Sequence, residues 1–336
     1  QSSTVSGYTS GGSPGYSNII DKFPFAADAN ATDVGDLTEG RYGASGQSSS
    51  ESGYTSGGRQ TVKTTIDKFP FASDANATDV SNLTGTRWSG AGQSSATHGY
   101  TVGGQPNDWE GVIDKFQFAS DGNATNAGGL AYNQGRYAPA GQSSIENGFG
   151  YTSGGGYPVQ NVRNTIDKFS FATDATYATV VGALTVSRRE TRGQSSTTHG
   201  YTSGGRTLPQ YYNVIDKFPF STDANATDVG DLTGGRSWGA GQSSTTHGYS
   251  AGDYPITNVI DKFPFSSDAD ATDVGALSVT RGIASGQSST VSGYTSGGYD
   301  TGPSNVIDKF PFSSDANATD VGDLTVSRYG SAGQQY

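Results

Sequence analysis

The sequence predicts an all-β, seven-bladed β-propeller, and three observations carry this prediction. One phrase, Ile-Asp-Lys-Phe, occurs seven times, at intervals of 45 to 53 residues, which is the period of propeller blades and solenoid coils. No window shows the 3.6-residue apolar periodicity of a helix, whereas aromatic and β-branched residues alternate with Gly, Asn and Asp punctuation. Each copy parses into four short extended segments, the content of one propeller blade. The units are centred on Asp21, Asp67, Asp114, Asp167, Asp216, Asp261 and Asp308.

The four segments of a unit are clearest between residues 42 and 84. Segment a covers residues 42–49, segment b 53–58, segment c 65–71 and segment d 77–84. Proline cannot donate a hydrogen bond to a sheet, so we expect segment c to end or bulge at its proline. These prolines are Pro24, Pro70, Pro219, Pro264 and Pro311.

The two ends of the chain predict a closed ring within a single domain, residues 1–336. The first unit lacks most of its segment a, whereas residues 328–334 form a segment a that no segment b follows. We therefore expect this C-terminal strand to complete the first blade, which removes the free sheet edges of an open array. Because the sequence begins at Gln1 without Met, we also expect a processed or excised form.

Composition excludes several classes of protein. The 336 residues include 50 Gly, no Cys, no Met and only 32% hydrophobic residues, so any core must be thin and spread out. Without Cys there is no disulfide scaffold, thiolate zinc site or Cys nucleophile. The net charge of −11 repels nucleic acid and anionic membranes, and no apolar run is long enough for a membrane span.

The repeated units resemble the kelch repeat. In the second unit, Tyr54 is followed by Gly57-Gly58, a variable loop, an apolar strand with aromatic residues, and then Leu83 and Arg87. The resemblance covers nearly the whole chain and implies a seven-bladed propeller. Val34 and Val80 stand where kelch repeats have a Trp, and the sixth unit has Gly252-Asp253 instead of Gly-Gly. The wording of the units is also similar to uncharacterised repeat proteins of marine bacteriophages.

The connections between segments predict where a ligand binds. The a–b and c–d connections are nearly constant in length, whereas the b–c connection varies from 6 to 10 residues and the d–a link varies in sequence. In an up-and-down blade, b–c and d–a connections emerge at the same end, so we expect one variable face that supplies aromatic contact area. The alternative is that these rings only cap the end of the ring and that unconstrained loops drift. The candidate ligand-binding residues are Tyr16, Arg59, Trp88, Trp109, Tyr132, Tyr157, Arg206, Tyr211, Tyr212, Trp238, Tyr254 and Tyr299.

One Asp in segment c and one Arg after segment d occur in every unit. Strand alternation turns the Asp toward a neighbouring blade, where an unpaired carboxylate would be costly. We therefore expect seven structural Asp–Arg or Asp–Lys contacts without a catalytic role. The residues are Asp21, Arg41, Asp67, Arg87, Asp114, Arg136, Asp167, Arg188, Asp216, Arg236, Asp261, Arg281, Asp308 and Arg328.

The stretch containing Asp28, Asn30, Thr32, Asp33 and Asp36 resembles a calcium loop in the spacing of its oxygen ligands. Across the units the last ligand is replaced by Asn, Gly or Ala, and the sharp-turn glycine is missing. Asx turns in a c–d hairpin explain the same residues, although weak calcium binding in units one, five and seven stays open. The Asn-x-Thr sequons in this stretch follow from the same turn, so we infer no glycosylation.

Catalysis has little support, and we expect no cofactor and no metal. His98, His199 and His247 occupy the same position in different units, so a ring keeps them apart. We therefore expect a non-enzymatic extracellular or virion-surface module that binds a glycan or protein receptor. One alternative is an assembly component of a virion or extracellular fibre, which would contact other subunits. A second alternative is a propeller hydrolase or lyase.

Overall fold

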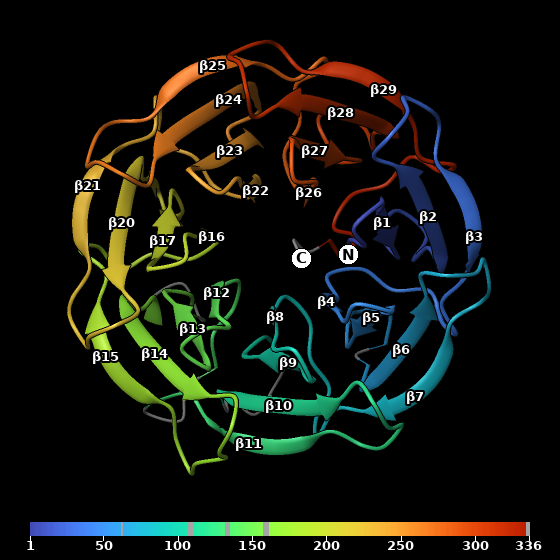
Figure 1. Ribbon diagram of the computed structural model, residues 1–336, viewed down its shortest axis with the longest axis horizontal. Helices are drawn as coiled ribbons and strands as arrows, with labels where there is room; N and C mark the ends of the chain where they lie inside the picture. The colour runs from blue at the N-terminus through green and yellow to red at the C-terminus, as the bar shows by residue number, and fades with distance from the viewer. Residues whose placement is uncertain (62, 106–110, 132–134, 157–160, 334–336) are drawn as a thin grey trace.

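The computed structural model describes residues 1–61, 63–105, 111–131, 135–156 and 161–333, in which seven antiparallel sheets form a closed ring (Figure 1). Strands follow one another outward in chain order. In the second blade, β4 (Ser45–Ser48) lines the central channel, followed by β5 (Ser52–Ser56), β6 (Thr65–Pro70) and the outermost β7 (Thr78–Asn82). The prediction of a seven-bladed propeller is therefore confirmed. No described helix has the length and apolar character that crossing a membrane requires.

The other blades repeat this order. Blade 1 contains β1 (Ser6–Ser10), β2 (Ile19–Pro24) and β3 (Thr32–Asp36); blade 3 contains β8 (Ala91–Ser94), β9 (His98–Val102), β10 (Val112–Gln117) and β11 (Thr125–Gly129). Blade 4 contains β12 (Ala140–Ser144), β13 (Phe149–Ser153), β14 (Thr165–Ser170) and β15 (Thr179–Ala183); blade 5 contains β16 (Arg192–Ser195), β17 (His199–Ser203), β20 (Val214–Pro219) and β21 (Thr227–Asp231). Blade 6 contains β22 (Ala240–Ser243), β23 (His247–Asp253), β24 (Thr257–Pro264) and β25 (Thr272–Ala276); blade 7 contains β26 (Ser285–Ser288), β27 (Ser292–Ser296), β28 (Val306–Pro311) and β29 (Thr319–Asp323). Wherever the third strand carries the expected proline, the strand ends on it.

Both ends of the chain complete the inner edge of blade 1. Ala332 pairs with Ser10, as expected for a closing C-terminal strand. The N-terminal end also contributes, which the sequence analysis did not foresee: Ser2 pairs with Gly7, and the carbonyl of Gln1 accepts a 2.7 Å hydrogen bond from the backbone N–H of Tyr8. The closing strand is thus shared between Ser2 and Ala332, which both pair with β1, and the N-terminus lies beside β1 (Figure 1).

The hydrophobic core consists of seven small clusters, each between two adjacent blades. In one of them, Tyr8, Ile20 and Leu37 of blade 1 pack against Phe69 of blade 2. The last cluster joins Phe23 to residues of blade 7 and so closes the ring. Fully burying such an apolar side chain contributes about 1.5–3 kcal/mol. A low hydrophobic content therefore suffices, because the core is a thin layer repeated seven times.

The first phenylalanine of each third strand lies on a glycine of its own blade. A Cβ atom on Gly53 would lie 2.3 Å from the Phe69 ring, and the same close approach occurs in the other six blades. In the Gly-Tyr dipeptide of segment b, the glycine thus leaves room for the phenylalanine ring, and the tyrosine contacts the next blade.

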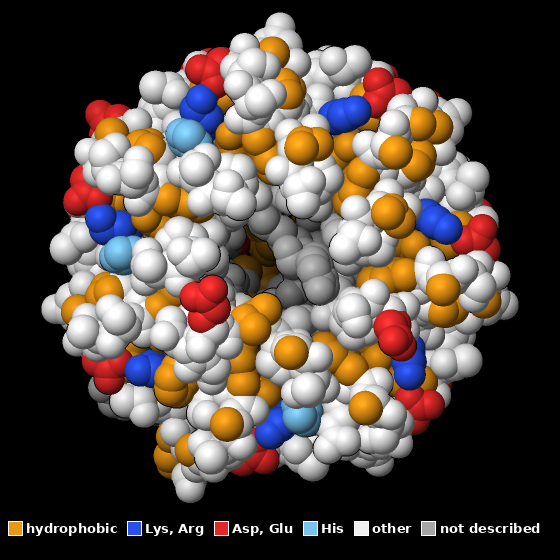
Figure 2. Space-filling view, in the orientation of Figure 1, with side chains coloured by type: hydrophobic (Ala, Val, Ile, Leu, Met, Phe, Trp, Pro, Cys, Tyr) orange, Lys and Arg blue, Asp and Glu red, His pale blue; other side chains and the backbone are white. Residues whose placement is uncertain are grey.

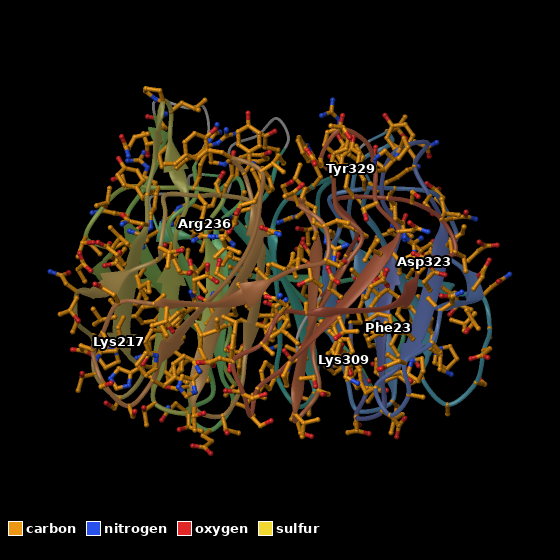
Figure 3. The ribbon with its side chains drawn as sticks, turned by 90° about the horizontal axis from the view of Figure 1, so that it is seen from above. Phe23, Lys217, Arg236, Lys309, Asp323 and Tyr329 are labelled. Carbon is orange, nitrogen blue, oxygen red and sulfur yellow. The ribbon has the colours of Figure 1, made fainter. Side chains whose placement is uncertain are left out.

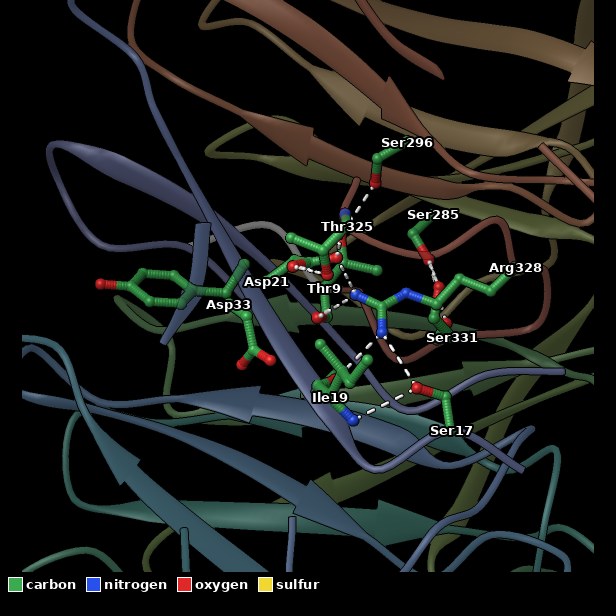
Figure 4. A network of polar contacts seen from close by, with 12 residues as sticks. Thr9, Ser17, Ile19, Asp21, Asp33, Ser285, Ser296, Thr325, Arg328 and Ser331 are labelled. Atoms are coloured by element: carbon green, nitrogen blue, oxygen red, sulfur yellow. Dashed lines mark hydrogen bonds and ion pairs between the residues drawn. The ribbon is translucent and has the colours of Figure 1, made fainter. Parts of the chain in front are cut away.

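A buried ion pair links each d–a connection to the third strand of the blade that follows. At the ring closure, the Arg328 guanidinium lies 2.6 Å from Asp21, and both side chains are fully buried (Figure 4). Thr325 donates two further hydrogen bonds to the Asp21 carboxylate, at 2.7 and 3.0 Å. All seven Asp–Arg contacts expected from the sequence are present: Arg328–Asp21, Arg41–Asp67, Arg87–Asp114, Arg136–Asp167, Arg188–Asp216, Arg236–Asp261 and Arg281–Asp308.

Two further repeated contacts join neighbouring blades. Each innermost strand holds a glutamine whose Nε2 donates to a carbonyl of the next blade, as from Gln47 to Tyr100 at 2.9 Å. On the surface, each third-strand lysine pairs with an aspartate of the next c–d hairpin. Basic and acidic side chains therefore alternate around the face in Figure 2. The pairs are Lys22–Asp74, Lys68–Asp121, Lys115–Asp174, Lys168–Asp223, Lys217–Asp268, Lys262–Asp315 and Lys309–Asp28.

Replacing one buried arginine tests the contribution of the buried pairs. Arg41→Met leaves the Asp67 carboxylate buried beside Thr38 alone, so we expect a loss of about 3–5 kcal/mol of unfolding free energy. The Arg41→Met/Asp67→Asn double variant should recover part of that loss, because no orphan charge remains. The measurement is the urea unfolding midpoint.

Lys22→Met is the matched control, because Lys22–Asp74 is a partly exposed pair that contributes less than about 1 kcal/mol. An equal loss in Arg41→Met and Lys22→Met would contradict the assigned role of the buried pairs.

Candidate functional site

The connections sort onto two opposite faces of the ring. The loop face carries the b–c and d–a connections, and the turn face carries the a–b and c–d connections. Figure 3 shows this division from the side: Tyr329 and Arg236, from d–a connections, lie toward one end, and Lys217 and Lys309 lie toward the other. The variable positions therefore share one face, as the up-and-down topology predicts.

On the loop face, the same backbone contact in every blade holds two residues opposite each other. The residue after the buried arginine faces the residue after the Gly-Gly pair; we call these the rim pairs. Tyr42 and Arg59, for example, exchange backbone hydrogen bonds of 3.2 and 2.8 Å. Six pairs form this isolated antiparallel bridge, and Tyr137 and Gly156 of blade 4 share one bond of 3.1 Å. The seven rim pairs are Tyr329/Ser13, Tyr42/Arg59, Trp88/Gln105, Tyr137/Gly156, Arg189/Arg206, Ser237/Tyr254 and Gly282/Tyr299.

The next residue of each d–a connection belongs to a closed ring of hydrogen bonds between blades. All seven residues have φ between 47° and 64°, and each N–H donates to the carbonyl of the residue in the preceding blade, at 2.7–3.3 Å. Glycine occupies only two of these left-handed positions, although other residues pay a conformational cost of about 1–2 kcal/mol there. We call this set the left-handed ring: Gly43, Ser89, Ala138, Glu190, Trp238, Ile283 and Gly330.

The predicted aromatic residues that the structure describes gather on the loop face. Tyr16 lies 5.8 Å from Tyr42, which lies 6.0 Å from Trp88, measured between ring centroids. Tyr137 then contacts both Trp88 and Trp238, at 5.5 and 5.9 Å. These five rings form an arc along the rim. Trp88 and Trp238, from different blades, are thus brought to one end of the ring.

A second aromatic group lies over blades 5 and 6. The b–c connection of blade 5 forms an extra hairpin, β18 (Arg206–Thr207) and β19 (Gln210–Tyr211), which places Tyr211 5.8 Å from Tyr254. Tyr254 is 45% exposed, and Arg206 packs over the Tyr211 ring at 5.7 Å. Tyr212 differs, because its carbonyl accepts a backbone bond from Arg236 and so supports the loop.

The remaining candidates divide into two groups. Arg59 is exposed and lies over the Trp88 ring at 4.9 Å, and Tyr299 is 38% exposed. Trp109, Tyr132 and Tyr157 lie outside the described residues. The sequence analysis missed Tyr42, Tyr137, Tyr329 and Arg189, which directly follow the repeated arginine. Counting from that arginine is the signal that would have found them.

Two departures from the repeat meet at the interface of blades 5 and 6. Arg192 stands where the other inner strands have Ser or Ala, and Asp253 replaces the second glycine of Gly-Gly. These two buried side chains form an ion pair, with Arg236 3.7 Å from the same carboxylate. Burial and the charge of Arg236 lower the pKa of Arg192 to about 9. Gly239 leaves room for the pair, because its Cβ would lie 2.1 Å from Asp253.

The calcium-like stretch takes part in contacts within the protein. Asn30 accepts a 3.0 Å hydrogen bond from the backbone N–H of Asp323 in blade 7, and Asp33 accepts one of 3.1 Å from Gly35, which is an Asx turn. The first Asp of the stretch pairs with a lysine of the preceding blade. Across the described residues, no group of three or more acidic or histidine side chains converges as metal ligands.

The three histidines lie apart, at equivalent positions of blades 3, 5 and 6. Each begins a second strand, and its ring nitrogen lies 2.8 Å from the hydroxyl of the preceding threonine. The central channel, a cavity of about 680 Å³, is lined mainly by Gly, Ser and Thr of the inner strands. Its glutamines are already engaged between blades, so the channel offers little reactive chemistry.

A scan against protein-family models and a search of curated proteins each found no match to this chain. The seven-bladed propeller therefore rests on the structure, and the kelch resemblance stays a prediction.

Removing the Arg192–Asp253 pair one residue at a time tests whether its members compensate each other. Asp253→Gly leaves Arg192 buried beside Arg236, so we expect a loss of about 3–5 kcal/mol in unfolding free energy. The Arg192→Ala/Asp253→Gly double variant restores the residue types of the other blades and should be more stable than Asp253→Gly alone. Urea unfolding of the single and double variants measures this coupling. Additive losses would contradict it.

Proposed function

We propose that the protein is a non-enzymatic recognition module of the kelch-like propeller type. It acts outside the cytosol, on a cell or virion surface, and binds a carbohydrate receptor through the loop face. The observation that carries the proposal is the contrast within the rim pairs and the left-handed ring. Their backbone hydrogen bonds repeat around the seven blades, whereas their side chains range from Gly to Trp and Arg.

Backbone conformation at the left-handed ring supports the same proposal. Five of its positions carry a side chain in a conformation that glycine adopts at no cost. Residues held in sparsely populated conformations cluster at binding and active sites, where the strained conformation is part of how the site works. Trp238 and Ile283 are the clearest cases, because a bulky and a β-branched side chain are least suited to this region.

The chemistry of the rim fits sugars. Partly exposed aromatic rings stack on the apolar faces of sugar rings and supply contact area at little entropic cost. Neighbouring Gln, Ser and Arg side chains offer hydrogen bonds to hydroxyl groups. Neighbouring rings of the arc lie 5.5–6.0 Å apart between centroids, so an extended glycan can contact several of them at once.

Removing one aromatic from the arc tests the proposal. For a glycan selected on an array, Trp88→Ala should weaken binding at least about fivefold, because a stacked ring at a binding hot spot contributes more than about 1 kcal/mol. Titration calorimetry gives the dissociation constants, and a denaturation curve shows that the variant remains folded.

Tyr177→Ala is the matched control, because Tyr177 is a 52% exposed aromatic in a c–d connection, away from the loop face. Its removal should leave the affinity unchanged. If no glycan binds, and the protein is instead found at a fixed place on a particle, the assembly role holds and the recognition proposal fails.

A further inference from the structure

The rim pair of blade 5 differs in kind from the other six. In blades 1 to 4 the residue after the buried arginine is aromatic, and in blades 6 and 7 the aromatic stands on the opposite side of the pair. Each of these six pairs thus holds one aromatic ring. Blade 5 instead places Arg189 opposite Arg206. Like charges directly opposite each other in a β-pair are destabilising, so this pair requires a compensating anion.

One protein carboxylate lies between the two arginines. Glu190, a buried member of the left-handed ring, forms an ion pair with Arg206, whose Nη2 lies 3.0 Å from Oε1. Although burial lowers the pKa of Arg206, the hydrogen bond and charge of Glu190 outweigh this effect and raise it. Arg206 also donates to the Tyr211 hydroxyl at 3.1 Å. All three nitrogens of Arg206 thus have a partner: Nη1 and Nη2 donate hydrogen bonds, and Nε, which makes no hydrogen bond, lies in the ion pair with Glu190.

Arg189 is not satisfied to the same degree. Its side chain is only 6% exposed, and its Nε lies 3.5 Å from Glu190. That Nε makes no hydrogen bond within the described part of the chain, and the guanidinium packs over Tyr137 at 5.4 Å. Two guanidinium groups thus share one carboxylate, which leaves an unbalanced positive charge in a nearly buried site. Such a charge is costly without a further partner.

The charges of the whole chain point to the same face. Fourteen of the twenty basic residues belong to the two repeated sets of ion pairs with aspartates. Of the other six, Arg192 lies in the inner strand β16 and is paired with Asp253, and Lys63 is paired with Glu39. The remaining four lie in b–c or d–a connections on the loop face: Arg59, Arg163, Arg189 and Arg206. The outermost strands carry aspartates outside those pairs, such as Asp36 and Asp79. An anionic ligand is therefore repelled by the outer surface and accepted at the loop face.

We propose that Arg189 and Arg206 of blade 5 form the anion subsite of the loop face. Its ligand is a carboxylate or sulfate group of an acidic glycan, whose neighbouring sugar rings stack on Tyr137 and Tyr211. This inference rests on the proposed function, because it names the class of glycan. The anion supplies the second negative charge that Arg189 and Arg206 require, and planar guanidinium groups bind either oxyanion through paired hydrogen bonds.

The test compares matched hexasaccharides by titration calorimetry: oligogalacturonate for carboxylate, sulfated chondroitin for sulfate ester, and uncharged xylohexaose. Wild-type protein should bind at least one acidic hexamer about tenfold or more tightly than xylohexaose at low salt, because a hydrogen bond to a charged group is strong. Arg189→Gln should abolish this preference and leave xylohexaose binding unchanged. Arg189→Lys, which retains the charge, should keep part of the preference. Circular-dichroism melting curves show that both variants are folded.

Arg163→Gln is the matched control, since Arg163 is an arginine of the neighbouring b–c connection in blade 4 and belongs to no rim pair. The Arg163→Gln variant should keep the preference for the acidic hexamer. Equal affinity for acidic and neutral hexamers, or an unchanged preference in Arg189→Gln, overturns the anion subsite. If xylohexaose binding still depends on Trp88 in that case, the proposed function stands alone. Tighter binding of a polyglutamate peptide than of either acidic hexamer overturns the assignment to glycans.

Discussion

The buried Arg–Asp pair between consecutive blades is the interaction on which the rest of the structure depends. Because a buried charge without a partner is costly, the arginine of each d–a connection must reach the aspartate of the following blade. In doing so, the chain brings the carbonyl of Arg41 to the N–H of Gly12, at 2.8 Å. This hydrogen bond holds the start of the b–c loop of blade 1 next to the buried arginine. The rim pair and the left-handed residue follow directly in the chain, so their positions are set by the ion pair.

This dependence separates what must stay constant from what can vary. Gly57 has φ of 63°, and a Cβ there would lie 2.5 Å from the carbonyl of Arg87, so the start of the b–c loop requires glycine. One residue beyond the Gly-Gly pair, the backbone is held by its own hydrogen bonds, and in blade 2 the side chain at this position, Arg59, is exposed. Variation such as Arg59 in one blade and Tyr299 in another therefore does not disturb the ring.

Near-identical blades raise the question of how the order of blades is kept. Most interfaces use the same Gln, Phe and Arg–Asp contacts, so any two blades could pair by these contacts alone. The Arg192–Asp253 pair makes the interface of blades 5 and 6 different, because Arg192 opposite a glycine of another blade would be a buried charge with no carboxylate. An ion pair that is specific to this interface therefore disfavours exchanged or shifted pairings of blades there.

The sequence by itself determined the number of blades, their strands, the proline that ends the third strand and the residue types of the buried pairs. These features are local or repeat at a fixed period, so one copy explains the others. Only the tertiary structure decided that Gln1 and Ala332 share one closing strand, that Arg192 meets Asp253 and that Arg189 faces Arg206. The left-handed conformation of Trp238 could not be predicted from the sequence either, because tryptophan favours other backbone conformations. Each of these features depends on contacts between segments far apart in the chain, which exist only after the ring has closed.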